Sequence, residues 1–146
     1  MKTKLCLLIL LIVGLSVQLS ANPINGLLER IDKGASKKFV IEFKKGADDF
    51  FELDQKGTKV VVRGNNYVNI ATGINWYLKY YAGIQLSWNG MQAKLPQVLP
   101  PVSRKERHET SLSLRYDFNY CTYSYTMAFW DWERWEKEID WMALRG

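Results

Sequence analysis

The amino-acid sequence predicts an α/β (α+β) fold in two unequal parts. Up to about residue 102, apolar residues recur both at the alternating period of strands and at the three-to-four-residue spacing of helices, which predicts a small sheet-and-helix domain. After a polar stretch, the chain continues with one strand pattern, an aromatic loop and one helix pattern. Four of the six tryptophans lie in this second part, between Trp130 and Trp141.

Residues 1–21 have the features of a secretory signal peptide. Lys2 and Lys4 form a short basic start, an apolar run follows, and Ala21 is a small residue at a plausible cleavage point. The run is short for a membrane span, although an uncleaved anchor is the alternative. Cys6 precedes the run, so it is a poor lipoprotein cysteine. We expect an exported protein, either periplasmic, cell-surface or secreted, with no membrane span after cleavage.

Charge and cysteine content narrow the possible partners. Removing residues 1–21 removes two lysines and no acids, which leaves 18 basic and 15 acidic residues spread over the chain. A nucleic-acid partner needs a tighter basic stripe, so we expect none. Cleavage also leaves Cys121 as the single cysteine, which excludes an internal disulfide. Cys121 is then either a small buried apolar residue or part of a site.

The amino-terminal domain, residues 22–102, is expected to start with a helix and three strands. The helix begins near Asn22, has apolar residues at helical spacing, and stops at Gly34. The three strands are expected at residues 39–43, 50–53 and 59–63. The turn residues 54–57 separate the last two strands, which predicts that they form a hairpin.

A second helix and a fourth strand should complete this domain. Asn65 or Asn66 can cap the helix, and Gly83 ends it. Its apolar positions form a wide stripe suited to packing on a sheet. Residues 84–88 follow as the fourth strand.

Residues 103–110 are expected to form a linker. Pro100 and Pro101 prevent a continuing helix, and the charged run after them is unsuited to a core. His108 is the single histidine. Because no cysteine or carboxylate cluster at metal-ligand spacing lies near it, we expect a solvated linker residue.

Residues 111–146 are expected to form one strand, one loop and one helix. Apolar and polar residues alternate from Leu112 to Cys121, which predicts a strand with two distinct faces. A lone strand and helix would leave the edges of the strand unpaired. We therefore expect this unit to need further strands, and the chain to be the truncated start of a larger fold.

The helix of this unit is expected to begin after Asp131, a good cap. Its buried stripe is expected to consist of Trp132, Trp135, Ile139 and Met142. Glu133 and Lys137 have the spacing of a favourable surface pair. Glu136 and Asp140 are expected on the same solvated side.

The familiar catalytic motifs are absent from the sequence. There is no Walker loop, dinucleotide-binding glycine pattern, nucleophile elbow or metal-ligand cluster. Enzymes that cleave glycosidic bonds need two placed carboxyl groups. Glu136 and Asp140 are four residues apart, but a solvated helix face does not provide such a site.

The end of the predicted strand at 112–121 is more suggestive. In a β/α barrel the substrate lies at the carboxyl ends of the strands and is lined by the loops that follow. Asn119, Cys121, Thr122 and Tyr125 would lie there and offer an amide, a thiol and two hydroxyls to sugar hydroxyls. Nearby aromatic rings could stack on a sugar. For Asn119 and Tyr125, pocket and structural roles are equally open.

Two segments here resemble a known family. Residues 119–125 read Asn-Tyr-Cys-Thr-Tyr-Ser-Tyr, and residues 130–146 read Trp-Asp-Trp-Glu-Arg-Trp-Glu-Lys-Glu-Ile-Asp-Trp-Met-Ala-Leu-Arg-Gly. Both resemble the start of the catalytic domain of α-N-acetylglucosaminidases, glycoside hydrolase family 89. The chain departs from the family at Phe129, where a tryptophan is frequent. Residues 71–78 and 86–90 resemble the family's amino-terminal domain more loosely.

The resemblance implies a small α/β domain, a (β/α)8 barrel and a large helical domain. This chain would contain the first domain and, in residues 111–146, the first strand-helix unit of the barrel. The implied reaction is retaining hydrolysis of terminal α-linked N-acetylglucosamine from glycans by two glutamates, with no metal or organic cofactor. Asn119, Cys121 and Tyr125 would contact the sugar or support its pocket. Both catalytic glutamates would lie beyond Gly146, so we expect no catalytic residue and no hydrolase activity here.

Two other interpretations belong to different classes of protein. The chain could be a free-standing carbohydrate-binding or scaffold module that ends at Gly146. It could also bind a lipid surface through its aromatic helix, although the acidic residues of that helix make it a poor binder of anionic membranes.

Overall fold

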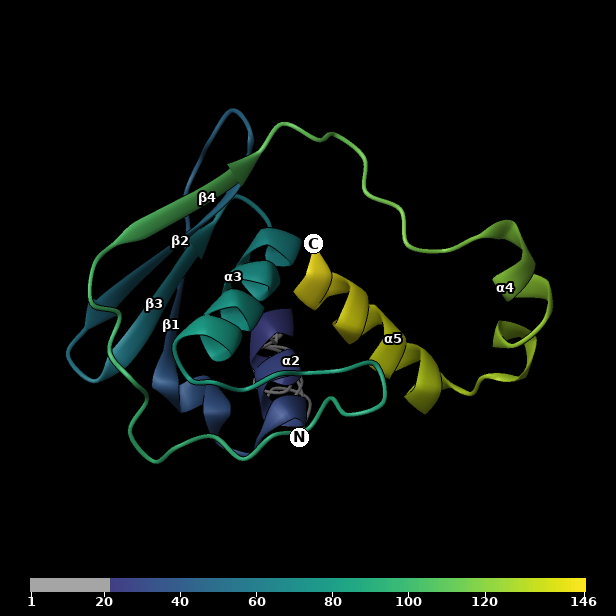
Figure 1. The fold of residues 1–146 in the computed structure, drawn as a ribbon, viewed down its shortest axis with the longest axis horizontal. Helices are drawn as coiled ribbons and strands as arrows, with labels where there is room; N and C mark the ends of the chain where they lie inside the picture. Colours follow the sequence, from purple (N-terminus) through teal and green to yellow (C-terminus); the bar gives the residue numbers. More distant parts are fainter. Residues whose placement is uncertain (1–21) are drawn as a thin grey trace, which may run out of the picture.

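The computed structural model describes residues 22–146, and the predicted signal peptide with Cys6 lies outside this range. The predicted mixed α/β class is confirmed. Figure 1 shows a sheet on one side, helices α2 (Pro23–Ile31) and α3 (Tyr67–Tyr80) beside it, and helix α5 (Trp132–Arg145) beyond them. Within this range, no helix has the length and apolar character needed to cross a membrane.

Helices α2 and α3 begin and end close to where the sequence predicts. The Asn22 side chain accepts a hydrogen bond from the backbone N–H of Ile24 at 3.0 Å. The Asn66 side chain caps α3 in the same way, by accepting from Asn69 N at 2.8 Å. A short 3-10 turn, η1 (Ala35–Lys38), follows α2.

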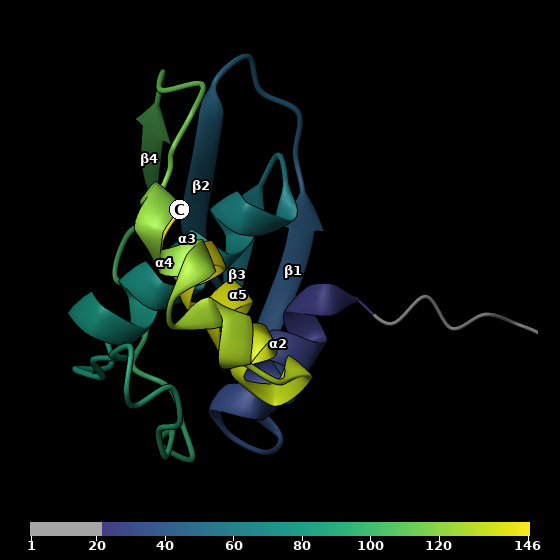
Figure 2. The same cartoon turned by 90° about the vertical axis from the view of Figure 1, so that its right-hand side faces the viewer.

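Four strands form one sheet in the order β1-β3-β2-β4. They are β1 (Phe39–Phe43), β2 (Asp49–Lys56), β3 (Lys59–Gly64) and β4 (Glu106–Thr110). β1 pairs with β3 in parallel, and the other pairs are antiparallel. The predicted hairpin is confirmed as β2 and β3. β2 runs further than predicted, because the turn is made at Gly57, whose φ of 61° is in the left-handed region. Figure 2 shows β4 and β1 at opposite edges.

Strand β4 corrects the linker predicted at residues 103–110. Its charged residues suggested a solvated connection, but this sheet has one face that no described helix covers. Arg107 and Glu109 can therefore occupy a strand and pair with charges on that open face. Charged residues are compatible with a strand here, because the open face of the sheet carries ion pairs and is not covered by a second layer of helices.

The prediction for His108 was also wrong. Its ring stacks on Phe51, with centroids 4.9 Å apart, and lies 4.2 Å from the ring centroid of Trp76 on α3. Its Nε2 is 3.2 Å from a carboxylate oxygen of Glu106. His108 therefore joins the edge strand to the helix layer, because β4 turns this residue toward the side that α3 covers.

Residues 84–88 do not form the predicted strand. Gly83 turns the chain at a φ of 66° after α3, and Ile84 N donates to the helix carbonyl of Leu78 at 2.8 Å. The chain then runs through a long loop, whose single backbone bridge joins Ser87 to Gly90. Two of the apolar residues that suggested a strand contribute to the core instead: Leu86 is almost fully buried, and Ile84 packs against the core.

The core lies between the sheet and helices α2 and α3. Gly73 lets α3 approach closely, since a Cβ here would lie 2.8 Å from Val62 Cγ1. Tyr77 is buried with its hydroxyl donating to the Pro100 carbonyl, and burial raises the pKa of Tyr77 to about 12. The core residues come from all parts of the domain and include Leu28, Leu53, Val60, Ile70, Ile74, Leu78, Leu95 and Leu99.

The strand predicted from Leu112 to Cys121 is also wrong. Residues 112–119 have no regular structure, and Tyr120–Ser124 form a short helix, α4. A second 3-10 turn, η2 (Met127–Phe129), follows. Alternation predicts a strand only where a neighbouring strand supplies hydrogen-bond partners, and no described strand lies beside this segment. Figure 1 shows it running from β4 to α4 over the outside of the molecule.

Helix α5 forms as predicted but presents a different face to the domain. Asp131 caps it by accepting from Arg134 N at 2.8 Å, and the surface pair of Lys137 and Glu133 is confirmed at 2.8 Å. Of the predicted buried stripe, Trp132 and Ile139 are exposed, with 69% and 46% of their surface accessible. Trp135 and Met142 are half-buried.

The buried residues of α5 are instead Glu138, Asp140 and Leu144. Asp140 was expected on a solvated face. It is buried because Arg30 on α2 binds both of its carboxylate oxygens, at 2.6 and 2.8 Å. Arg30 on α2 therefore compensates the charge of Asp140 on the covered side of α5.

Glu52 is the centre of an ion network on the open face of the sheet. Only 3% of its side chain is exposed, and its carboxylate lies 2.7 Å from Lys44 Nζ, 3.0 Å from Arg107 and 3.3 Å from Lys105. Burial raises the pKa of this carboxyl, but hydrogen bonds from these three cations outweigh burial and hold its pKa at about 2. The network connects β2 to β4 through Arg107. It also connects β2 to Lys44, which directly follows β1, and to Lys105, which directly precedes β4.

We expect Glu52→Gln to lower the free energy of unfolding at pH 7 by about 1–2 kcal/mol. Because the pKa falls from 4.5 to about 2 on folding, the ionised carboxylate stabilises the native state fully above pH 4.5 and progressively less toward pH 2. Urea unfolding at a series of pH values should therefore show a smaller loss of stability on acidification in the variant. Parallel pH profiles for the two proteins would contradict the assignment.

Candidate functional site

The three residues predicted to contact sugar lie at α4, but in different settings. Asn119 caps this helix, and its Oδ1 accepts from the N–H groups of Cys121 and Thr122 at 2.9 and 3.0 Å. Cys121 is half-buried, and Tyr125 ends the helix with 69% of its surface exposed. Asn119 therefore has a structural role in this conformation, in addition to any contact with a ligand.

A cavity of about 340 Å³ lies next to α4, and we call it the α4 cavity. Asn119 and Thr122 line it, whereas Cys121 and Tyr125 do not. Its walls are otherwise rich in indole rings, from Trp88 of the amino-terminal domain and from Trp130 and Trp141. An amide, a hydroxyl and flat apolar surfaces together provide what a sugar ring needs for hydrogen bonding and stacking.

Glu138 fixes the wall that the two parts of the chain share. Only 3% of its surface is exposed. Its Oε2 accepts hydrogen bonds from Trp88 Nε1 and from the Arg134 guanidinium, both at 2.7 Å. Arg134 also lies over the rings of Trp88 and Trp130, at 4.9 and 3.9 Å from their centroids. The carboxylate of Glu138 thus joins Trp88 of the amino-terminal domain to Arg134 of α5 in this wall.

The chemistry of the α4 cavity suits recognition better than hydrolysis. Asp117 and Glu138 both line it, and cleavage of a glycosidic bond needs two carboxyl groups facing the bond. Glu138 accepts hydrogen bonds from Arg134 and Trp88, so its carboxylate has a structural role in this wall. Trp141 Nε1 is buried without a hydrogen-bond partner among residues 22–146, which leaves an unused donor in this wall.

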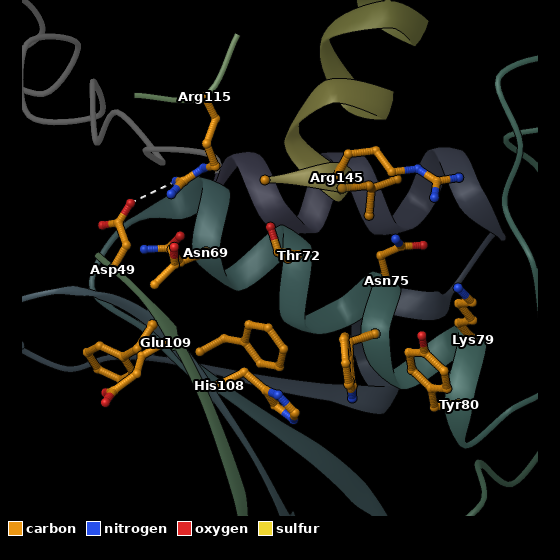
Figure 3. Close-up of a pocket in the computed structure, with 16 residues that line it drawn as sticks. Asp49, Asn69, Thr72, Asn75, Lys79, Tyr80, His108, Glu109, Arg115 and Arg145 are labelled. Atoms are coloured by element: carbon orange, nitrogen blue, oxygen red, sulfur yellow. Dashed lines mark hydrogen bonds and ion pairs between the residues drawn. The ribbon is translucent and has the colours of Figure 1, made fainter. Parts of the chain in front are cut away.

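A second hollow, about 390 Å³ in volume, lies between α3, β4 and the last turn of α5. Figure 3 shows Arg115 paired with Asp49 at one end of this groove, and Lys79 and Tyr80 at the other. The ion pair is 2.7 Å long, and hydrogen bonding from Arg115 lowers the pKa of Asp49. Its floor includes the stacked ring of His108.

The groove suits an apolar or aromatic group, because most of its surface comes from rings and aliphatic carbon. It has no arrangement of acid, base and nucleophile. In residues 22–146, no group of three or more histidine, cysteine, aspartate or glutamate side chains is placed to hold a metal ion. The α4 cavity is therefore the better candidate for sugar recognition.

The position of the α4 cavity depends on how α5 is attached to the amino-terminal domain. Arg30 binds Asp140 through two hydrogen bonds and approaches Glu136 at 3.3 Å. The hydrogen bonds to Asp140 and the negative charges of both acids raise the pKa of Arg30. Further along α5, Arg145 donates to the Leu86 carbonyl at 2.9 Å. Both acids are thus bound to the domain, where Asp140 is buried and Glu136 is half-buried.

Sequence reasoning found Asn119 but missed Trp88 and Glu138. Trp88 was placed in a strand that does not form, and Glu138 was considered only as one of the acidic residues that make the helix a poor binder of anionic membranes. Their separation of 50 positions hides the hydrogen bond between them. The available signal was weak: Trp88 lies in the segment 86–90, which resembles the family only loosely.

Comparison with known sequence families gives two matches along the chain. Residues 22–101 match the domain described as "Alpha-N-acetylglucosaminidase (NAGLU) N-terminal domain". Residues 115–146 match the one described as "Alpha-N-acetylglucosaminidase (NAGLU) tim-barrel domain".

Relatives of known function and structure agree with these matches. Human alpha-N-acetylglucosaminidase is 39% identical over 115 residues, which cover 79% of this chain and 16% of the human protein. A family 89 glycoside hydrolase from Clostridium perfringens, in complex with 2-acetamido-1,2-dideoxynojirmycin, has a TM-score of 0.77 at 36% identity, over 84% of this chain and 14% of its own.

The Clostridium enzyme has also been solved with two glutamates replaced by glutamine, in complex with its substrate GlcNAc-alpha-1,4-galactose. That structure has a TM-score of 0.79 at 38% identity, with the same coverage of 84% and 14%. The chain therefore spans less than a fifth of the length of these relatives.

We expect Arg30→Ala to loosen α5, because it leaves the buried Asp140 carboxylate without its partner. The free energy of unfolding should fall by about 1–3 kcal/mol, and the amides of α5 should exchange with solvent faster. Lys137→Ala is the matched control, since it removes an exposed ion pair of the same helix and should cost at most about 0.5 kcal/mol. Equal effects in hydrogen exchange would count against Arg30 as the anchor of α5.

Proposed function

Because this chain belongs to the alpha-N-acetylglucosaminidase family, glycoside hydrolase family 89, we propose that it is the amino-terminal part of an exported glycosidase. The complete enzyme would remove terminal α-linked N-acetylglucosamine from glycans. The observation that carries this proposal is the succession of two domains of one family along a single chain, at 36–39% identity to its relatives.

In this proposal the α4 cavity is the part of the sugar site that the chain provides. Asn119 and Thr122 would hydrogen-bond the sugar, and the indole rings around them would contact its apolar face. Cys121 and Tyr125 would support the loop or reach the sugar after a change of conformation, since neither lines the cavity here. The Clostridium relative, bound to GlcNAc-alpha-1,4-galactose, supports a glycan with terminal α-linked N-acetylglucosamine as the ligand.

The surface of residues 111–146 supports a place within a larger barrel. Leu114, Phe129 and Trp132 have 79%, 89% and 69% of their surface exposed. Apolar side chains at this density are typical of a surface that another structural element covers, which the remaining barrel would do.

The carboxyl groups that line the α4 cavity do not provide the pair that hydrolysis needs. Retaining glycosidases use two carboxyl groups about 5 Å apart across the sugar. Glu138 is held in an ion pair, and the solved Clostridium variant with its bound substrate has two glutamates replaced. We therefore assign sugar recognition to this chain and the chemical step to later parts of the barrel. The predicted signal peptide at residues 1–21 would direct the enzyme out of the cytoplasm.

The direct test is cleavage of an aryl α-N-acetylglucosaminide. We expect no release of the aryl group by residues 22–146, and release by a chain extended through a complete barrel. The aryl β-anomer is the control for nonspecific hydrolysis. Turnover by residues 22–146 alone would overturn the assignment of the chemical step, and inactivity of the well-folded extended chain would overturn the assigned function.

The sugar contact of Asn119 can be separated from its capping role in the extended enzyme. Serine caps helices about as well as asparagine but lacks the amide. We expect Asn119→Ser to lower kcat/KM by about tenfold or more while leaving the melting temperature close to that of the parent. Asn119→Ala should lower both. If the serine variant retains full activity, Asn119 is a structural residue only.

A further inference from the structure

A second cleft, distinct from the α4 cavity, lies where the amino-terminal domain meets α5. Its volume is about 460 Å³. It is bordered by the end of α2, by the loop at residues 88–92 and by the first half of α5. We call it the Trp88 cleft. Trp88 lines both hollows, but the other walls of the two are made by different residues.

The indole of Trp88 is exposed and yet held in a fixed orientation. Its surface is 48% accessible. Its Nε1 donates at 2.7 Å to Glu138, which is itself 3% exposed. The Arg134 guanidinium covers one face of the ring, with its central carbon 4.9 Å from the ring centroid. A ring that is fixed before binding loses little conformational entropy when a flat ligand stacks on its open part.

Polar groups surround this ring at the edge of the cleft. The side-chain amides of Asn89 and Gln92 come from the same loop, and the carboxylates of Glu133 and Glu136 come from α5. Amides and carboxylates beside an indole face match the alternating hydroxyl groups and apolar C–H face of a pyranose ring. The loop thus offers stacking and hydrogen bonding from one side, and α5 offers hydrogen-bond acceptors from the other.

The charges of the cleft select among glycans. Four carboxylates line it, from Glu29, Glu133, Glu136 and Asp140, against the two cations of Arg30 and Lys137. Both cations are already paired with acids of the cleft, at 2.6 Å for Arg30 and Asp140 and 2.8 Å for Lys137 and Glu133. A sulfate or uronate group would meet an excess of negative charge with no unpaired cation to compensate it.

We propose that the Trp88 cleft is a second carbohydrate-binding site, which takes a neutral pyranose unit of a glycan. Trp88 stacks on the sugar, and Asn89, Gln92 and Glu136 bind its hydroxyl groups. The site lies on the first domain and the first helix of the second, so it holds a part of the glycan away from the α4 cavity. It goes beyond the proposed glycosidase function and does not require it.

Binding is tested on the purified chain with the neutral disaccharide GlcNAc-α-1,4-galactose, followed by the indole and amide resonances in two-dimensional NMR titrations. We expect saturable shifts at the side-chain amides of Asn89 and Gln92, which line the Trp88 cleft and not the α4 cavity. Trp88→Ala should weaken the affinity by about tenfold or more, and Gln92→Ala by about threefold or more. The same disaccharide with a sulfate on its N-acetylglucosamine should bind more weakly than the neutral one.

Three controls make these outcomes specific. Trp132→Ala removes an exposed tryptophan that lines neither hollow, and Asn119→Ser alters only the α4 cavity. Both should keep the affinity at the Trp88 cleft within about twofold. Trp88→Phe keeps an aromatic ring but loses the hydrogen bond to Glu138, so it should bind with intermediate affinity. This variant keeps the proposal testable if Trp88→Ala does not fold.

The proposal is overturned if the neutral disaccharide leaves the side-chain amide resonances of Asn89 and Gln92 unchanged. It is equally overturned if Trp132→Ala weakens binding as much as Trp88→Ala, or if the sulfated disaccharide binds as tightly as the neutral one. Because the readout is binding at the cleft, a lack of turnover by the extended enzyme would contradict the glycosidase function and leave these results intact.

Discussion

The attachment of α5 to the amino-terminal domain by buried charges is the constraint on which the rest of the second part depends. Arg30 holds Asp140, and Trp88 holds Glu138. These contacts turn the acidic side of α5 inward and leave apolar residues such as Trp132 outside. The bidentate pair of Arg30 with Asp140 adds geometric specificity to this contact. The apolar side thereby stays available for another layer, while the rings near α4 keep a defined position.

The amino-terminal sheet uses charge in a comparable way on its open face. Glu52 lies almost fully buried beside Lys44, Lys105 and Arg107, each of which is paired with its carboxylate. The Arg107 guanidinium lies 3.6 Å from the ring centroid of Phe50. One layer of helices therefore suffices for this sheet, because ion pairs across the strands protect the other face. Both parts of the chain thus rely on buried carboxylates that basic side chains surround.

Local signals in the sequence were enough for α2, α3, α5 and the hairpin of β2 and β3, since caps, helical spacing and turn residues act within a few positions. The sequence motif also led to Asn119 at the start of α4. What could not be predicted depends on distant partners. The burial of Asp140 needs Arg30, which is 110 positions away, and β4 needs the edge of β2. The wall formed by Trp88 and Glu138 likewise appears only when the loop after α3 meets α5.

Strand β4 also determines where the first domain can be cut from the rest of the chain. The family's two domains are matched at residues 22–101 and 115–146, so β4, at Glu106–Thr110, falls between them. A protein engineer who separated the domains at residue 102 would remove an edge strand, two of the cations around Glu52 and the ring that stacks on Phe51. The backbone of β2 would then be open to pairing with other molecules. The stretch between the two matched regions therefore belongs to the amino-terminal domain, because it contains the edge strand β4 of that domain's sheet.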